Sequence, residues 1–207
     1  MNAKPTVFIV DDDYAVRDSF SMLFETLGIA VECFPSAEEF LEVYDPERPG
    51  CLVLDVNMPG MRGIELHEEL IRRGNHIPII FLTAHGDIPM TVRAIKAGAI
   101  DFLTKPIQAK QLIDHVKRAF VHDAELHEQA MQEKARCARL SVLSPREYEV
   151  MMLAVTGFSN KDIARKLGIS YRTVEIHRSR VLEKTGTHSF LELAHLANPQ
   201  AVQAHPS

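Results

Sequence analysis

The 207-residue sequence predicts a doubly wound parallel α/β domain, joined by a helical linker to a smaller all-α domain. Short apolar runs alternate with helix-like segments from residue 6 to about residue 120, and no strand-like run follows residue 139. Such alternation is typical of β-α units that build a parallel sheet with helices on both faces. We therefore place the α/β domain at residues 1–120, the linker at 121–138 and the all-α domain at 139–207.

Four apolar runs of the first domain each end at an acidic, hydroxyl or amino side chain. The runs cover residues 7–10, 52–54, 79–82 and 102–104, and the polar residues that follow them are Asp11, Asp55, Thr83 and Lys105. Short apolar runs bounded by polar residues are typical of buried parallel strands. In open parallel sheets, ligands bind outside the carboxyl ends of the strands, where the strand order reverses. A structural acid would occur at one strand end and not at each of them, so this pattern indicates a functional site.

Five helix-like segments accompany the strands, and five β-α units predict the strand order 2-1-3-4-5. The first helix carries apolar residues at helical spacing from Val16 to Leu27 and is stopped by Gly28. A capping box that begins at Ser36 starts the second helix. The second to fifth helices are expected at residues 36–44, 63–73, 90–97 and 108–124.

The remaining chain is predicted to be helical. Residues 121–138 are polar, helix-prone and without Gly or Pro, which predicts a helical extension of the fifth helix and not a flexible tether. Ser144, Ser159 and Ser170 are expected to cap the next three helices, and Pro145 and Glu147 strengthen the first of these starts. A further helix at residues 189–197 would complete a four-helix domain.

Composition narrows the class of protein. With 46% hydrophobic and 25% charged residues, the chain is ordinary for a globular protein. No apolar stretch approaches the roughly 20 residues that span a bilayer, and no apolar signal segment opens the sequence. The three cysteines are widely spaced and odd in number, which fits a reduced chain. We therefore expect a cytoplasmic protein without a membrane partner.

Basic residues are concentrated in the second domain. Residues 139–195 hold nine Lys and Arg against six Asp and Glu, a net charge of +3, whereas the preceding 138 residues hold 14 against 22, a net −8. A local basic excess in an acidic protein indicates a nucleic-acid-binding module. The ten histidines lack the spacing of metal ligands, so no zinc site is expected.

The acids at the first and third strand ends predict acyl-phosphate chemistry. In the expected order these strands are neighbours, so Asp11, Asp12 and Asp55 converge and require a cation to neutralise them. Mg²⁺, which takes oxygen ligands and retains waters, is the expected occupant. A carboxylate beside Mg²⁺ can attack a phosphoryl donor and become an aspartyl phosphate. Lys105 and Thr83 would then face the charged oxygens of the transferred group.

Residues 6–120 resemble the receiver domain of two-component response regulators, which has a flavodoxin-like fold. The resemblance rests on Asp11-Asp12, Asp55, Met58-Pro59-Gly60, Thr83-Ala84 and Lys105-Pro106. It implies that Asp55 is the phosphoacceptor, that Asp12, Asp55 and the Asn57 carbonyl bind Mg²⁺, and that Asp11 acts through water. It also implies that Thr83 and Lys105 contact the phosphoryl group and that the Lys105–Pro106 peptide bond is cis.

The same resemblance implies a switch. Phe102 matches the family's switch aromatic, which rotates inward when Thr83 moves toward a phosphoryl oxygen and so couples the new charge to packing. Phe102 could equally be an ordinary core residue. The fourth-helix face would then form a phosphorylation-dependent dimer contact, through Met90, Ile95, Ala99 and Ile100. Asp13, in contrast, is expected to cap the first helix.

Residues 159–178 have the pattern of a helix-turn-helix motif. Ala164 allows two helices to cross closely, and Gly168 allows the tight turn between them. The second helix is expected to direct Arg172, Thr173, Glu175, His177, Arg178, Arg180 and Lys184 outward. A recognition helix in the major groove needs such side chains for bases and phosphates.

Residues 144–196 resemble the four-helix LuxR-type DNA-binding domain, whose third helix recognises DNA and whose fourth makes a dimer contact. By this match, Thr173, Glu175, His177 and Arg178 would approach bases. Lys161, Arg180 and Lys184 would hold phosphates.

Together the two resemblances identify the chain as a transcriptional response regulator of the FixJ-like group, and not as an enzyme. They imply a sensor histidine kinase as phosphodonor, promoter DNA and RNA polymerase as partners, a homodimer on phosphorylation, and activation of transcription. Two alternatives remain. A haloacid-dehalogenase-type phosphatase would use Asp11 and Asp13, but Ala15 stands where that family has Thr or Val. A protein-interaction scaffold would dock the helical domain on another protein, which the outward arginines disfavour.

Overall fold

The computed structural model describes residues 4–83 and 101–197. The helix expected at residues 90–97 lies outside the described residues, and so does the expected dimer contact through Met90, Ile95, Ala99 and Ile100. By its contacts the chain divides into two compact units, Met1–Glu128 and Gln129–Ser207.

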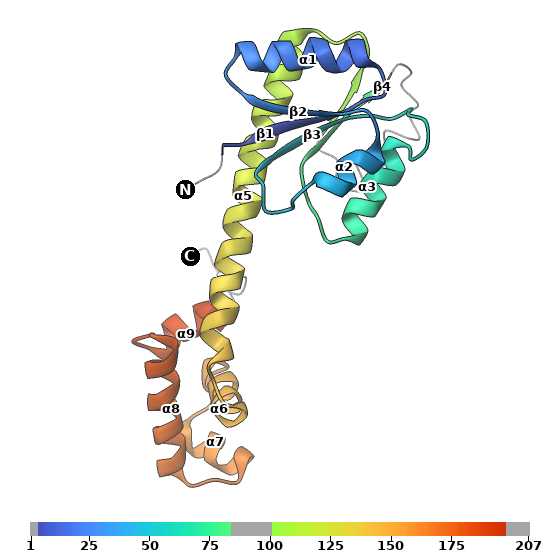
Figure 1. Cartoon of the computed structure of the whole chain (residues 1–207). Helices are drawn as coiled ribbons and strands as arrows, with labels where there is room; N and C mark the ends of the chain where they lie inside the picture. Colours follow the sequence, from blue (N-terminus) through green and yellow to red (C-terminus); the bar gives the residue numbers. More distant parts are fainter. Residues whose placement is uncertain (1–3, 84–100, 198–207) are drawn as a thin grey trace. The chain divides into compact units, whose positions relative to one another are not determined.

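The first unit is built on a five-stranded parallel sheet with the order β2-β1-β3-β4-β5, as predicted (Figure 1). The strands are β1 (Thr6–Val10), β2 (Ala30–Phe34), β3 (Gly50–Asp55), β4 (Ile79–Thr83) and β5 (Asp101–Thr104). β1 and β3 are neighbours in register, so Val10 pairs with Leu54. This pairing brings the residues that follow β1 beside Asp55 at the carboxyl edge of the sheet, where ligands of such sheets bind.

Helices cover both faces of the sheet. The described helices of this unit are α1 (Tyr14–Thr26), α2 (Ala37–Val43), α3 (Gly63–Arg72) and the first part of α5 (Ala109–Ser141). Alternate strand residues point to opposite faces. Val7 and Ile9 therefore pack with α1 and α5, whereas Phe8 and Val10 pack with α2 and α3. The buried side of each helix fits the apolar spacing found in the sequence.

Local signals set most helix ends as expected. Asp13 caps α1 by accepting the backbone N–H of Ala15, and Ser36 caps α2 by accepting that of Glu39. The fifth helix and the linker form one continuous helix, α5, from Ala109 to Ser141. The helix predicted for residues 121–138 is thus present, without a break at its start.

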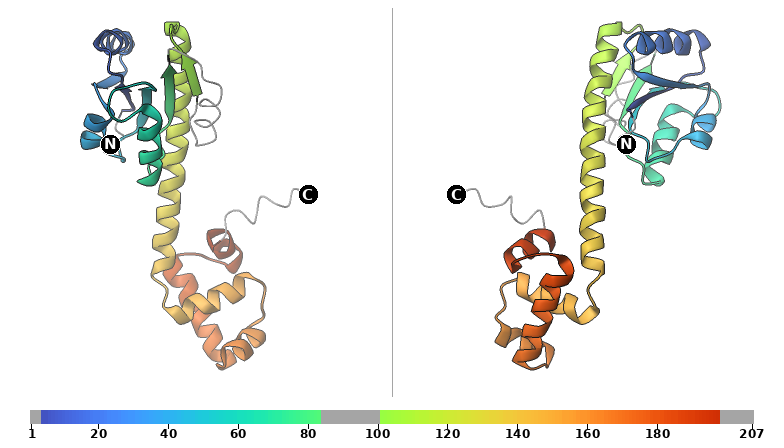
Figure 2. Two further views of the ribbon diagram at one scale, coloured as in Figure 1. Left: turned by 90° about the vertical axis from the view of Figure 1, so that its right-hand side faces the viewer. Right: turned by 60° about the vertical axis from the view of Figure 1, so that its left-hand side comes forward.

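The second unit contains α6 (Pro145–Val155), α7 (Asn160–Leu167), α8 (Tyr171–Thr185) and α9 (Phe190–Ala197) (Figure 2). Ser144, Ser159 and Ser170 cap the first three of these helices through backbone N–H groups, as predicted. Gly168 ends α7 with a φ of 63°, a left-handed conformation that favours glycine. Val150, Ile163 and Val174 form the buried core between α6, α7 and α8.

None of the helices in the described ranges combines the length and apolarity that a bilayer crossing requires.

Candidate functional site: an acidic cluster and a helix-turn-helix

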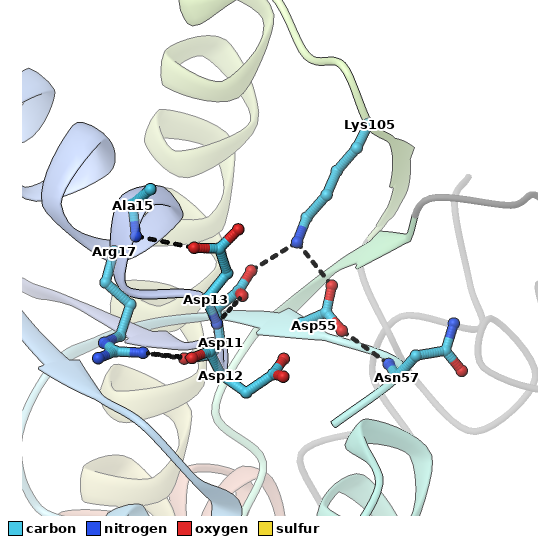
Figure 3. A network of polar contacts seen from close by, with 8 residues as sticks. All are labelled: Asp11, Asp12, Asp13, Ala15, Arg17, Asp55, Asn57 and Lys105. Atoms are coloured by element: carbon cyan, nitrogen blue, oxygen red, sulfur yellow. Dashed lines mark hydrogen bonds and ion pairs between the residues drawn. The ribbon is translucent and has the colours of Figure 1, made fainter. Parts of the chain in front are cut away.

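Lys105 bridges two buried carboxylates at the carboxyl edge of the sheet. Its Nζ lies 2.6 Å from Oδ2 of Asp11 and 2.7 Å from Oδ1 of Asp55 (Figure 3). Asp11 follows β1 and is 1% exposed, while Asp55 ends β3 and is 6% exposed. The three residues come from three strand ends, so their meeting depends on the predicted strand order. The structure therefore brings together the acids and the lysine that the sequence placed at one site.

Backbone N–H groups orient both carboxylates. The N–H of Asp13 donates to Oδ1 of Asp11 at 3.0 Å, and that of Asn57 donates to Oδ2 of Asp55 at 2.7 Å. The carbonyl of Asp55 is closely approached by Gly63, where a Cβ atom would lie only 2.2 Å from it. A glycine is therefore required at this first residue of α3.

Burial and the ion pair act in opposite directions on the pKa values of Asp11 and Lys105. Burial raises the pKa of Asp11, against the opposing hydrogen bonds from Lys105 and from the Asp13 N–H. Burial would lower the pKa of Lys105, but its hydrogen bonds to Asp11 and Asp55 outweigh burial and raise this pKa. Lys105 is therefore held as a cation between the two acids.

Asp12 and Asp13 have different surroundings from Asp11. Both are exposed, and Arg17 fixes the turn by donating to the carbonyls of Asp11 and Asp12 at 2.7 and 3.0 Å. Asp13 turns toward Ala15 as the cap of α1, whereas Asp12 turns its carboxylate away from Ala15 (Figure 3). Asp13 therefore caps α1, as the sequence predicted.

The oxygen donors of this acidic cluster fit Mg²⁺. No three His, Cys, Asp or Glu side chains within residues 4–83 and 101–197 form a preformed metal cage. Mg²⁺ does not need one, because it usually binds through one or two carboxylates and keeps several waters. The exposed carboxylate of Asp12, that of Asp55 and the carbonyl of Asn57 are hard oxygen donors of this kind. These residues would hold the ion if it binds.

Thr83 and Phe102 lie on the strands that border the acids. Thr83 ends β4 and is buried, and its carbonyl accepts the backbone N–H of Lys105 at 2.7 Å. The Lys105–Pro106 peptide bond is cis, as the resemblance implied. Phe102 is half-buried and packs on Phe81, with ring centroids 5.8 Å apart. It is therefore part of the hydrophobic core and also borders the surface.

The helix-turn-helix is formed by α7 and α8, and α8 exposes one continuous face. Exposed residues recur at helical spacing along it: Arg172, Glu175, Ile176, Ser179 and Arg180. We call these five residues the recognition face. Lys161 of α7 is also exposed. Within the described part of the chain, Lys161, Arg172 and Arg180 have no acidic partner, so their charges are available to a ligand.

Four of the side chains expected to point outward from α8 are half-buried or have a partner within their own domain. Lys184 forms an ion pair with the buried Glu147 of α6, with 2.7 Å between Nζ and Oε2. The guanidinium of Arg178 stacks 3.9 Å from the centroid of the Phe190 ring of α9. Thr173 and His177 are half-buried, and Nδ1 of His177 is sealed without a hydrogen-bond partner. Thr173, His177 and Arg178 are thus less exposed than Arg172, Glu175 and Arg180, whereas Lys184 is exposed but already paired with Glu147.

Sequence reasoning missed Ile176 and Ser179. Ile176 is a large apolar residue that is 45% exposed in the middle of α8. The signal was available, because these positions follow Arg172 by four and seven residues and so share its side of the helix. Ile176 was left out because only charged, hydroxyl and imidazole side chains were considered as DNA contacts.

Comparisons with known proteins agree with both units. Models of the response regulator receiver domain and of the luxR family of bacterial regulatory proteins match residues 7–117 and 141–197, respectively. Nodulation protein W of Bradyrhizobium diazoefficiens is 42% identical over 203 residues, which cover 98% of this chain and 89% of that protein. Transcriptional regulatory protein FixJ of Azorhizobium caulinodans is 44% identical over 194 residues, which cover 92% and 90%.

Solved structures show the same architecture. The structure of response regulator StyR matches with a TM-score of 0.83 and 46% identity, over 95% of this chain and 100% of StyR. Full-length FixJ from B. japonicum matches with a TM-score of 0.59 and 37% identity, over 98% and 100% of the two chains. The chain therefore belongs to the two-component transcriptional response regulators that join a receiver domain to a LuxR-type DNA-binding domain.

Proposed function

We propose that phosphorylation of Asp55 by a partner sensor histidine kinase switches this chain into a dimeric, promoter-bound activator of transcription in the cytoplasm. The observation that carries the proposal is the Lys105 bridge between Asp11 and Asp55 at the carboxyl edge of the sheet. Structural ion pairs occur elsewhere in proteins, but this one holds a carboxylate and a cation together where such sheets bind ligands.

The proposed reaction is a phosphoryl transfer to Asp55. A carboxylate oxygen of Asp55 forms a bond to phosphorus while the bond from phosphorus to the donor atom breaks. The donor, a phosphohistidine or a small acyl phosphate, leaves with the electron pair. The Lys105 ammonium lies 2.7 Å from Asp55 and would neutralise charge on the phosphoryl oxygens. Bound Mg²⁺, held by Asp12, Asp55 and the Asn57 carbonyl, would supply further charge neutralisation.

The proposed switch connects this reaction to the surface of the receiver. Thr83 would donate its hydroxyl to a phosphoryl oxygen, and Phe102 would move into the space that Thr83 leaves. Phe102 already contacts the core through Phe81, which supports such a coupling. Homodimerisation would then bring two DNA-binding units onto paired half-sites, because one helix makes too few contacts for high specificity.

The recognition face is the proposed DNA contact. Glu175 can accept from the amino group of cytosine, and Ile176 offers an apolar contact to the methyl group of thymine. Arg172, Arg180 and Lys161 would neutralise phosphates. Thr173, His177, Arg178 and Lys184 would act at the edge of this surface, and chiefly by holding α8 in place. RNA polymerase would be recruited to the bound promoter.

The proposal is tested by incubating the full chain with acetyl phosphate and Mg²⁺ and locating the phosphate by mass spectrometry. We expect one phosphoryl group on Asp55, and none in Asp55→Asn. Asp18→Asn, an exposed acid on α1, is the matched control and should be modified like the wild type. A phosphate that persists unchanged in Asp55→Asn would overturn the assignment of the phosphoacceptor.

A second measurement tests the output. Phosphorylated chain should bind promoter fragments more tightly and sediment as a dimer, and transcription with purified RNA polymerase should rise. Turnover of generic phosphate esters, with continuous release of phosphate, would instead favour the phosphatase alternative.

A further inference from the structure

Arg62 occupies a position where local rules disfavour it. It is the N-cap residue of α3, and its side chain makes no hydrogen bond to the first turn of that helix. N-cap side chains are normally hydrogen-bond acceptors, whereas a guanidinium can only donate. The helix dipole also disfavours a cation at a helix N-terminus. The acidic side chain of Glu65 offsets part of this unfavourable interaction, because it accepts the backbone N–H of Arg62 at 2.8 Å. A locally unfavourable residue of this kind is often placed by function.

The guanidinium of Arg62 rests against a neutral amide near Asp55. Its Nη2 donates to Oδ1 of Asn57 at 2.8 Å, and the backbone N–H of Asn57 donates to Asp55 at 2.7 Å. Arg62 is exposed and has no carboxylate partner among the residues that the structure describes. Arg72 and Arg73, at the other end of α3, both pair with Glu69. Arg62 thus differs from the other arginines of its own helix.

The loop that carries Arg62 is fixed to its surroundings. The backbone N–H of Met61 donates to Oε1 of Glu38 on α2 at 2.9 Å. The next residue along the loop, Gly63, lies so close to the Asp55 carbonyl that only glycine fits. The Arg62 backbone is therefore anchored on both sides beside Asp55, while its side chain remains free to change partner.

We propose that Arg62 supplies a second protein cation to the phosphoryl group of Asp55, exchanging its contact with Asn57 for phosphoryl oxygens. The inference rests on the proposed function of Asp55. A phosphoryl oxygen is a far stronger acceptor for a guanidinium than a neutral amide oxygen, so the exchange is favourable. Arg62 forms no covalent bond in the transfer, in which Asp55 gains phosphorus and the donor leaves with its electron pair.

A charge count supports the need for this cation. Asp11, Asp12 and a phosphoryl group of nearly two negative charges together carry about four negative charges. Lys105 and a divalent ion supply only about three positive charges. One further positive charge near Asp55 would balance the set, and Arg62 contacts Asn57, whose backbone N–H binds Asp55.

The test measures the rate of Asp55 phosphorylation in the full chain by acetyl phosphate and Mg²⁺, over a range of ionic strengths. Three variants are compared with the wild type. Arg62→Gln keeps a hydrogen-bond donor for Asn57 but removes the charge, and Arg62→Lys keeps the charge. Arg73→Gln removes one charge from the far end of the same helix and is the matched control. Thermal unfolding, followed by circular dichroism, confirms that all variants are folded.

We expect Arg62→Gln to lower the second-order rate constant about three- to tenfold and to weaken its dependence on salt. Arg62→Lys should recover at least half of that loss on a logarithmic scale, and Arg73→Gln should match the wild type. Equal rates for Arg62→Gln and Arg73→Gln would overturn the inference, and so would equal rates for Arg62→Gln and Arg62→Lys. A wild type that acquires no phosphate on Asp55 would instead refute the proposed function itself.

Discussion

The Nζ of Lys105 lies 2.7 Å from Oδ1 of Asp55, the same carboxylate that we propose as phosphoacceptor. This contact and the one to Asp11 offset one of the two negative charges of these carboxylates. A Mg²⁺ ion bound by Asp55 would therefore compete with Lys105 for the carboxylate, and this competition can be measured.

Replacing Lys105 with Met should expose this competition. Without the ammonium, Asp11 and Asp55 repel each other, so Lys105→Met measured without metal should lose about 2 kcal/mol of unfolding free energy. This loss is smaller than for a fully buried ion pair, because the Lys105 side chain is partly exposed to solvent. Its affinity for Mg²⁺ should rise several-fold. Urea unfolding in EDTA and titration calorimetry with Mg²⁺ measure the two effects. Lys110→Met, an exposed lysine on α5, is the control. An unchanged Mg²⁺ affinity would contradict the prediction.

Asp11→Asn should stabilise the metal-free protein at neutral pH. Burial raises the pKa of folded Asp11 above its ordinary value of 3.8, so the folded state binds this proton more tightly than the unfolded state. Stability is therefore lost as the pH rises from 3.8 through the higher folded pKa. Removing the charge should raise the free energy of unfolding by about 0.5–2 kcal/mol at pH 7, the range typical of single stabilising substitutions.

The pH dependence is the check on Asp11→Asn. Urea unfolding in EDTA across acidic and neutral pH should show that its advantage disappears below pH 3.8, where the wild-type side chain is protonated in both states. Asp18→Asn should show no such trend. A variant that is less stable than the wild type at pH 7 would mean that the bond to Lys105 outweighs burial.

Glu147→Gln should destabilise the DNA-binding unit in a pH-dependent way. The hydrogen bond from Lys184, with that from the Ser144 N–H, lowers the pKa of Glu147 to about 2, against an ordinary value of 4.5. The contribution of the Glu147 carboxylate to the free energy of unfolding is therefore complete above pH 4.5 and is lost as the pH falls toward 2. We expect a cost of about 1–2 kcal/mol at pH 7, because Lys184 is partly screened by solvent.

This prediction is checked by thermal unfolding of Glu147→Gln, with Glu149→Gln as the control. Glu149 is exposed and pairs with Arg146 on the same helix, so its substitution should change stability by less than about 0.5 kcal/mol. Equal losses in the two variants would show that Lys184 is not held by Glu147 in solution.

Asp123→Ala should loosen α5 from the sheet. Oδ2 of the buried Asp123 accepts the backbone N–H of Gly50, at the start of β3, at 2.8 Å. Removing the acceptor leaves a buried N–H without a partner, at a cost of about 1–3 kcal/mol. Hydrogen exchange should accelerate at Gly50, and Asp114→Ala, an exposed acid on α5, should leave it unchanged. Unaltered protection of Gly50 in Asp123→Ala would refute this role.

Arg180 and Lys184 should differ in DNA binding although both are basic residues of α8. Arg180→Gln should weaken binding to all sequences and lower the slope of log affinity against log salt by about one. Lys184→Gln should change that slope much less, because its ammonium is paired with Glu147. Fluorescence anisotropy at several salt concentrations measures both slopes. A larger slope change for Lys184→Gln would reverse our assignment of the phosphate contacts.

Much of this protein could be predicted from local sequence. The strand runs, the serine caps of α6, α7 and α8, and the position of Asp55 at a strand end follow from patterns that span only a few residues. Strand order then placed Asp11 beside Asp55, because parallel strands with short connections admit few topologies. The acidic cluster of Asp11, Asp55 and Lys105 was predictable for this reason.

The tertiary structure alone decided which charged side chains are free. Lys105 meets acids that are 94 and 50 positions away in the chain, and Lys184 meets Glu147 from 37 positions away. Helical spacing predicts which side of α8 a residue occupies. It does not predict whether another helix places a carboxylate or an aromatic ring against that side. Lys184 and Arg178 therefore have partners within their own domain, whereas Arg180 and Arg62 have no acidic partner among the described residues, because pairing depends on distance in space and not on residue type.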